Sequence, residues 1–278
     1  MRLLRDIFVV GTACFFAVMW GLVLRERLAV PRAPAMKPNY DALLTKDEQR
    51  REFTMGIYLG DKRLGTTRTE IERIESGGIG VHNNTRLELG ALPKYIAPLA
   101  SGLEVDFYAD ISPLQGLRMV RLFSDALGVR LVGTVDEGRL AIRGIVGKQR
   151  FETDIPYDEG LLLGEALSPM AGFPDLRHAR VGDAWSVHVI NPLVGSVQEV
   201  RVNLESIREV ELHGRKRRVY RLLFHASNRV WLTWITDDGA VLVQGTPFGL
   251  TLRRDDLTPE VLAALGEPRA DEIRSRHE

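Results

Sequence analysis

The sequence predicts an all-β protein. We expect one antiparallel β domain, as a curved sheet or half-barrel or as a sandwich, behind an N-terminal transmembrane helix and before a short C-terminal helix. Short alternating runs separated by turn residues begin at Phe53. Few helical patterns interrupt these runs, which argues against βαβ units. Similar segments at 111–116 (ISPLQG) and 190–195 (INPLVG) suggest two related halves, with shared turn chemistry as the competing explanation.

Composition narrows the functional classes. The 278 residues include 37 Lys+Arg and 37 Asp+Glu, so a strongly basic nucleic-acid platform is not expected. With 45% hydrophobic and 27% charged residues, the chain is not a disordered one. The single cysteine, Cys14, excludes an intrachain disulfide and a cysteine-based zinc cage. The six histidines lack metal-ligand spacing, and we predict no metal and no cofactor.

Residues 1–28 are predicted to be a membrane anchor. Ile7 to Leu24 is an uncharged run of eighteen residues, which makes about 27 Å of helix. It is longer than the ~7–15 residues of a signal-peptide core, although a cleaved or trimmed signal remains the alternative. Basic residues flank both ends, and the short N-tail with Arg2 and Arg5 suits a cytoplasmic N-terminus. We therefore expect a single-pass protein of a bacterial inner membrane, with its main domain in the periplasm.

The anchor also carries a stripe of small residues. Ala13, Ala17 and Gly21 recur at every fourth position, and so lie on one side of a helix. Such stripes let membrane helices pack closely. They predict association with a second copy or with another inner-membrane protein, unless they only reflect how common small residues are in membrane helices.

Residues 29–51 are expected to form a stalk, because Pro31, Pro34 and Pro38 punctuate a stretch with little periodicity. A short helix around Tyr40 to Arg51 is an alternative for its second part.

The β domain is predicted to cover residues 52–256. It opens with a hairpin, Phe53–Leu59 and Leu64–Glu72, around the turn Gly60-Asp61. Six more strands follow at Val81–Leu89, Leu103–Asp110, Gly116–Ser124, Val129–Val135, Arg139–Ile145 and Arg150–Ile155. A helix is predicted over Glu159–Leu167, closed by Ser168-Pro169.

The β pattern then resumes and leads to the C-terminal helix. The predicted strands are Trp185–Ile190, Val197–Leu212, Arg215–Phe224, Asn228–Ile235, Ala240–Gly245 and an edge strand at Thr251–Arg254. Residues 257–266 predict a helix, with Thr258 as its cap, Pro259 in its first turn and Gly266 at its end. The last twelve residues, 267–278, contain seven charged ones and are predicted to be disordered.

No catalytic set can be recognised. The paired acids Asp237-Asp238 lack further oxygen ligands for a cation, and precede Gly239 as a hairpin turn would. Ser168, Ser186 and Ser196 offer hydroxyls, and His178 and His188 offer bases, but none lies in a Gly-x-Ser-x-Gly elbow. We expect no enzyme activity, although a triad could still assemble across the fold.

Two further patterns suggest binding. The basic run Arg215, Lys216, Arg217 and Arg218 would either contact anionic lipid headgroups or protect an exposed strand edge.

In the predicted strand Asn228–Ile235, alternation places Trp231 and Trp234 on opposite faces. Trp231, Thr233 and Ile235, together with Phe224, predict an apolar face that builds core or lines a ligand groove.

Several segments carry a family resemblance: Met55–Gly65 (MGIYLGDKRLG), Gly182–Trp185 (GDAW), Ile190–Leu193 (INPL), Trp234–Leu242 (WITDDGAVL) and Thr246–Leu250 (TPFGL). They resemble the β-rich exported domains that accompany bacterial transglutaminase-like proteins, often as their N-terminal region. The resemblance covers roughly Phe53 to Arg254 and implies an exported accessory or binding domain. The catalytic part of that family would carry Cys, His and Asp, but this chain ends soon after the β domain and has no cysteine there.

The sequence thus predicts a membrane-anchored extracytoplasmic β domain. We expect it to act as a non-catalytic accessory or binding subunit of an envelope membrane complex, without nucleic acid. The alternative is a half-barrel that carries a lipid or another apolar ligand. A hydrolase would need a triad that the sequence does not reveal.

Overall fold

The fold is taken from a computed structural model, which describes residues 40–44, 47–88, 102–114, 116–157, 161–163, 176–191, 196–226, 229–246 and 249–266. By its contacts the chain divides after Pro34, and every described residue lies in the second unit, Ala35–Glu278. The predicted anchor, including Ala13, Ala17 and Gly21, lies outside the described residues. Within the described residues, no helix has both the length and the hydropathy needed to span a bilayer.

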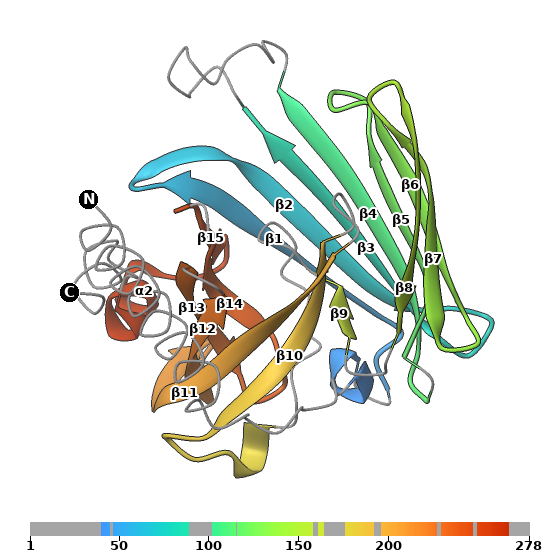
Figure 1. Cartoon of the computed structure of the whole chain (residues 1–278). Helices are drawn as coiled ribbons and strands as arrows, with labels where there is room; N and C mark the ends of the chain where they lie inside the picture. Colours follow the sequence, from blue (N-terminus) through green and yellow to red (C-terminus); the bar gives the residue numbers. More distant parts are fainter. Residues whose placement is uncertain are drawn as a thin grey trace, which may run out of the picture. The chain divides into compact units, whose positions relative to one another are not determined.

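The described strands form one hydrogen-bonded sheet (Figure 1). The first wing contains β1 (Arg50–Leu59), β2 (Lys62–Arg73), β3 (Ile79–Leu87), β4 (Leu103–Ser112), β5 (Gly116–Ser124), β6 (Val129–Asp136), β7 (Arg139–Val146) and β8 (Gln149–Pro156). The second wing contains β9 (Leu161–Leu163), β10 (Ala184–Asn191), β11 (Ser196–Leu212), β12 (Arg215–Ala226), β13 (Arg229–Thr236), β14 (Val241–Gly245) and β15 (Thr251–Arg254). The described residues also include three short helices: η1 (Tyr40–Leu43), η4 (Leu176–His178) and α2 (Pro259–Leu265).

The order of the fifteen strands is β8-β7-β6-β5-β4-β3-β2-β1-β15-β14-β13-β12-β11-β10-β9. Neighbours pair antiparallel, except that β9 runs parallel to β10. Among the described strands no pairing joins β8 to β9, so the sheet is open there. The prediction of an all-β antiparallel fold is confirmed, and the strands lie in one continuous sheet rather than in a sandwich.

The prediction of an edge strand at Thr251–Arg254 is wrong, because strand β15 lies inside the sheet. It pairs with β14 on one side and with β1 on the other, and thereby joins the two wings. Its short length and polar residues are typical of an edge. Its central place depends on pairing with β1, far away in the sequence, which no local pattern encodes.

The prediction of a helix over Glu159–Leu167 is wrong at residues 161–163. Leu161–Leu163 form strand β9, with Leu162 opposite Val189 of β10. A short apolar run cannot be assigned to helix or strand from periodicity alone. The other residues of the predicted helix lie outside the described part of the chain.

The C-terminal helix is confirmed. Thr258 caps α2 through a hydrogen bond from the Val261 backbone N–H to its Oγ1, and Pro259 occupies the first turn. Gly266 ends the helix with a positive φ of 73°. Val261 and Leu265 pack against the sheet in one apolar cluster with Trp234 and Val219. The face of the sheet that α2 covers is called the outer face below.

The opposite face, called the inner face, carries the two larger apolar clusters. The first cluster belongs to the first wing and includes Ile71, Val81, Ala109, Val120, Leu131, Leu140 and Ile142. The second cluster belongs to β1 and the second wing and includes Met55, Ile57, Trp185, Val202, Tyr220, Leu222 and Leu252. Phe53 of β1 packs against both clusters, which places them side by side on one face.

The packed domain reaches back into the range that was expected to be stalk. Tyr40, Leu43 and Leu44 are buried in the first cluster. Burial, together with the neighbouring Tyr157 phenol, raises the pKa of Tyr40 well above its ordinary value. The sequence echo between 111–116 and 190–195 stays untested, because residues 192–195 lie outside the described ranges.

Candidate functional site on the inner face of the sheet

An aromatic pair lies on the inner face of the second wing. Phe224 of β12 stands directly opposite Trp231 of β13. Their rings are stacked, with centroids 5.4 Å apart and an angle of 14° between the planes. Trp231 and Ile235 pack in the second cluster, whereas Trp234 packs in the cluster under α2. The predicted division of the two tryptophans between opposite faces is therefore confirmed.

Within the part of the chain that the structure describes, two buried donors of this face have no hydrogen-bond partner. The side chain of Trp185, 2% exposed, carries an unpaired Nε1–H, and that of Tyr220, 0% exposed, carries an unpaired hydroxyl. Alternation along β10 and β12 turns both side chains into the second cluster. Buried polar atoms are nearly always hydrogen-bonded, so an unpaired one calls for an explanation.

The cross-strand neighbours of these donors are aliphatic. Across the strands, Tyr220 stands opposite Ile207 on one side and Ile235 on the other. Trp185 stands opposite Val202. A buried water needs two to four polar partners, and these aliphatic neighbours provide none.

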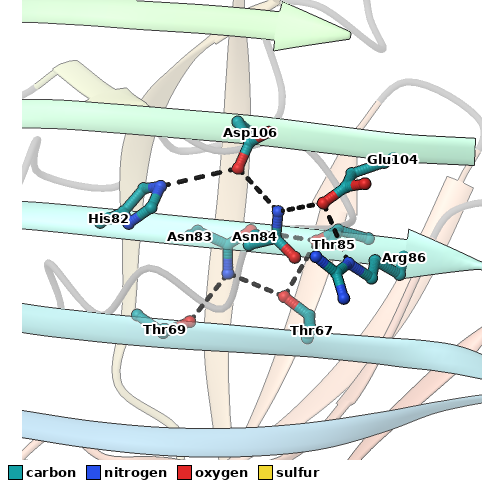
Figure 2. A network of polar contacts seen from close by, with 9 residues as sticks. All are labelled: Thr67, Thr69, His82, Asn83, Asn84, Thr85, Arg86, Glu104 and Asp106. Atoms are coloured by element: carbon teal, nitrogen blue, oxygen red, sulfur yellow. Dashed lines mark hydrogen bonds and ion pairs between the residues drawn. The ribbon is translucent and has the colours of Figure 1, made fainter. Parts of the chain in front are cut away.

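A ring of four polar side chains lies on the inner face of β2 and β3 (Figure 2). Asn83 donates from its amide nitrogen to the hydroxyl oxygens of Thr67 and Thr69, each at 2.8 Å. Thr85 lies 2.9 Å from the Thr67 oxygen and 3.0 Å from the Asn83 carbonyl oxygen. All four side chains are at most 2% exposed. Thr67 and Thr69 stand opposite Met55 and Phe53, so the ring lies beside the junction of the two apolar clusters.

The ring satisfies almost all of its own hydrogen-bonding groups. Thr85 can donate to the Asn83 carbonyl, and Thr67 can donate to Thr85, while the Asn83 amide uses both of its hydrogens. One hydrogen is left over, that of the Thr69 hydroxyl, which has no acceptor among the described residues. The ring is therefore chiefly a structural element with one spare donor.

A second polar network lies on the outer face of β3 and β4 (Figure 2). Asn84 donates to Glu104 at 2.8 Å and to Asp106 at 2.7 Å, and Arg86 donates to Glu104 at 2.9 Å. Hydrogen bonds from Asn84 and Arg86 lower the pKa of Glu104. His82 lies 3.6 Å from Asp106, and its side chain is half exposed. This network is a solvated cross-strand ladder, which contributes little to stability per pair.

Charge is absent from the buried part of the inner face. Among the described residues no charged side chain is buried. Two partly buried arginines are paired with carboxylates: Arg51 binds Glu48 at 2.9 and 2.7 Å, and Arg254 binds Asp256. Arg254 lies over the Phe53 ring, 5.7 Å from its centroid. The buried part of the inner face thus presents apolar and neutral polar groups among the described residues.

The basic run Arg215–Arg218 lies at the start of β12, next to the hairpin that joins it to β11. Along this run β12 pairs with β11, whereas its pairing with β13 begins only at Val219, so protection of an exposed strand edge stays a prediction. Arg217 forms ion pairs with Asp237 at 3.6 Å and with Asp238 at 4.0 Å. Lys216 and Arg218 stand opposite Glu211 and Glu209. Because acids accompany these cations, contact with anionic headgroups stays a prediction.

Asp237 and Asp238 occupy the turn between β13 and β14, as predicted. Gly239 has a φ of 79°, and Thr236 donates its hydroxyl to Asp238. Burial alone would raise the pKa of Asp238, but the Thr236 hydrogen bond and the charges of Arg51 and Arg217 lower it. In the described part of the chain, no group of three or more potential ligands could hold a metal ion.

The serine and histidine candidates do not come together in the described residues. Ser186 is buried in β10, and His178 is exposed in η4. Ser168, and the side chains of His188 and Ser196, lie outside what the structure describes. Sequence reasoning missed the unpaired donors of Trp185 and Tyr220. The sequence shows that Trp and Tyr side chains carry an N–H or a hydroxyl group. Whether that group finds a hydrogen-bond partner depends on the folded chain.

Comparisons with known proteins identify no family. No family model matches the chain, and no curated protein matches it. A matching solved structure is the crystal structure of a beta-barrel-like protein of domain of unknown function DUF1849 from Brucella abortus. It shares 10% identity with this chain at a TM-score of 0.45, over 80% of this chain and 96% of that one. The expected membership in the transglutaminase-associated domains gains no support from these comparisons.

Proposed function

We propose that this domain binds an apolar small molecule, such as a lipid, on the inner face of its sheet, and that it is not an enzyme. The observation that carries this proposal is the pair of unpaired donors, Trp185 and Tyr220, within a buried apolar face. Burying a donor without an acceptor costs free energy that a face built only as core does not recover. A bound molecule with an apolar body and an acceptor oxygen would satisfy both the face and the donors.

The proposed setting is the periplasmic side of a bacterial inner membrane. The uncharged run Ile7–Leu24 supports it, because an anchor of this length would tether the domain to the source of an apolar ligand. A tethered domain could accept a lipid from the bilayer and present it to another envelope component.

A second candidate, docking as an accessory subunit of an envelope complex, is favoured by a patch on the outer face. Phe123, Val132 and Ile145 are 36, 45 and 46% exposed on the adjacent strands β5, β6 and β7. The guanidinium of Arg130 lies 5.2 Å from the centroid of the Phe123 ring. Exposed apolar side chains next to arginine are typical of protein interfaces. An inner-membrane protein or a second copy would be the partner.

The test compares the two faces directly. The full chain is delipidated and titrated with a fluorescent acyl probe, and the protein is examined by native mass spectrometry for bound lipid. We expect saturable binding that Trp231→Leu weakens by about tenfold, because the stacked pair is lost. The matched outer-face variant Phe123→Leu should bind as the wild type does. Absence of saturable binding, or equal loss in both variants, would refute the proposal.

A further inference from the structure

We infer that the ligand carries a neutral carbonyl group, as an acyl ester does, and that its oxygens accept hydrogen bonds from the Tyr220 hydroxyl and the Trp185 Nε1–H. This inference rests on the proposed function and adds the chemical class of the ligand. The two donors are uncharged, buried and unpaired, and both project from the inner face of the second wing.

The donors specify an acceptor. An indole N–H can only donate, and a phenol hydroxyl that has no partner still has a hydrogen to give. A ligand that is a pure hydrocarbon would leave both groups unpaired, at the full cost of their desolvation. A ligand with carbonyl oxygens pairs them in an environment of low polarity, where a hydrogen bond is strong.

The charge distribution selects a neutral acceptor over a carboxylate. Burying a carboxylate without a counter-ion is far more costly than burying an ester. No charged side chain is buried among the described residues, and Arg51 and Arg254 already bind Glu48 and Asp256. The structure therefore favours an acyl ester over a free fatty-acid anion.

The ring on β2 and β3 is not the recognition element. Asn83, Thr67 and Thr85 use their hydrogens within the ring, and only the Thr69 hydroxyl has one to spare. A ligand headgroup would gain little from groups that are already paired. The selectivity for an acceptor therefore comes from the second wing.

Three probes with matched chains test the inference on the delipidated full chain: methyl oleate, oleate at alkaline pH, and octadecene. We expect methyl oleate to bind about tenfold more tightly than octadecene, the equivalent of one to two hydrogen bonds. Oleate should bind more weakly than methyl oleate. Tyr220→Phe should bring methyl oleate to the affinity of octadecene and leave octadecene unchanged, whereas the outer-face control Tyr108→Phe should change neither.

A spectroscopic readout supplements the affinities. In the protein with isotope-labelled indole nitrogen, the Nε1–H resonance of Trp185, assigned with Trp185→Phe, should move downfield with methyl oleate and not with octadecene. The shift itself is measured on the wild-type chain and does not depend on the affinity of any variant. Tyr220→Phe remains the variant for the affinity measurements if Trp185→Phe folds poorly.

The outcomes separate the inference from the proposed function. Equal affinities for the three probes, with Tyr220→Phe indistinguishable from wild type, would overturn the ester inference and leave apolar binding intact. Tighter binding of oleate than of methyl oleate would also overturn it. Failure of all three probes to bind would overturn the proposed function itself.

Discussion

The Tyr220 hydroxyl is a group whose removal should not harm the free protein. It is fully buried and has no hydrogen-bond partner, so the folded state bears its desolvation without compensation. We predict that Tyr220→Phe leaves the free energy of unfolding of the ligand-free chain unchanged or raises it by about 1 kcal/mol. Urea unfolding of the delipidated chain measures this. A loss of stability would indicate a partner for the hydroxyl and remove its role toward a ligand.

Removing the Asn83 side chain, in contrast, should destabilise the protein, because three buried hydroxyls form hydrogen bonds with it. Asn83→Ala removes its hydrogen bonds with Thr67, Thr69 and Thr85, so the Thr69 hydroxyl loses its bond to the ring while Thr67 and Thr85 keep the bond between them. We predict a loss of about 2–4 kcal/mol in the free energy of unfolding.

The adjacent Asn84 provides the matched control for Asn83. It has the same side chain, but its partners, Glu104 and Asp106, lie on the solvated outer face. Asn84→Ala should cost less than about 1 kcal/mol. Equal effects of the two substitutions would show that the ring is not buried as described.

Asp238 should make stability depend on pH. Burial opposes its ionised form, but the Thr236 hydrogen bond and the charges of Arg51 and Arg217 prevail and lower its pKa. Its contribution is therefore present above the ordinary carboxyl pKa and is lost as pH falls through the lowered value. We expect thermal unfolding of the wild type to lose more stability than that of Asp238→Asn in this acidic range. Parallel pH profiles would contradict the assignment.

At the scale of elements, most strands could be predicted because each one carries its own pattern. Alternation and turn residues placed the predicted strands Gly116–Ser124 and Val129–Val135 in agreement with β5 and β6. Trp231 and Trp234 were assigned to opposite faces for the same reason. Local patterns could not show that Thr251–Arg254 pairs with β1, or that Leu161–Leu163 pairs with β10. Both depend on contacts between distant segments.

The turn at Gly239 offers a test of one such local prediction. Its φ of 79° is disfavoured for residues with a branched side chain, although no atom lies within 4 Å of an added Cβ. Backbone strain alone should therefore make Gly239→Val less stable by about 1 kcal/mol or more. Gly239→Asn should lose less, because asparagine tolerates positive φ. Unchanged thermal unfolding of the valine variant would mean that the turn relaxes at no cost.

At the scale of the whole molecule, the boundary of the β domain is testable by deletion. Deleting Met1 to Arg27 should release a soluble, folded domain, because the predicted anchor precedes the first strand by a Pro-rich stretch. Extending the deletion through Leu44 removes Tyr40, Leu43 and Leu44 from the first cluster. That should cost several kcal/mol, as the loss of buried large side chains does. Aggregation of the shorter deletion under all mild conditions would show that residues 1–27 belong to the fold.

The candidate site was predictable only in part. Alternation in the sequence already placed Phe224, Trp231 and Ile235 on one apolar face, with a ligand groove as one interpretation. The unpaired donors were not predictable, because whether Trp185 and Tyr220 find partners depends on what β10, β11 and β13 place beside them. The polar ring combines Thr67 and Thr69 with Asn83 and Thr85, and it required the register between β2 and β3.

The central claim is that the inner face of the second wing binds a ligand. Photo-crosslinking of the delipidated full chain with a diazirine-bearing acyl ester, followed by peptide mapping, tests it most directly. We predict labels on β10, β12 and β13 at inner-face positions such as Trp185, Phe224 and Trp231, with competition by unlabelled methyl oleate. Labels confined to the outer-face patch of Phe123, Val132 and Ile145, or labelling that methyl oleate does not reduce, would contradict it.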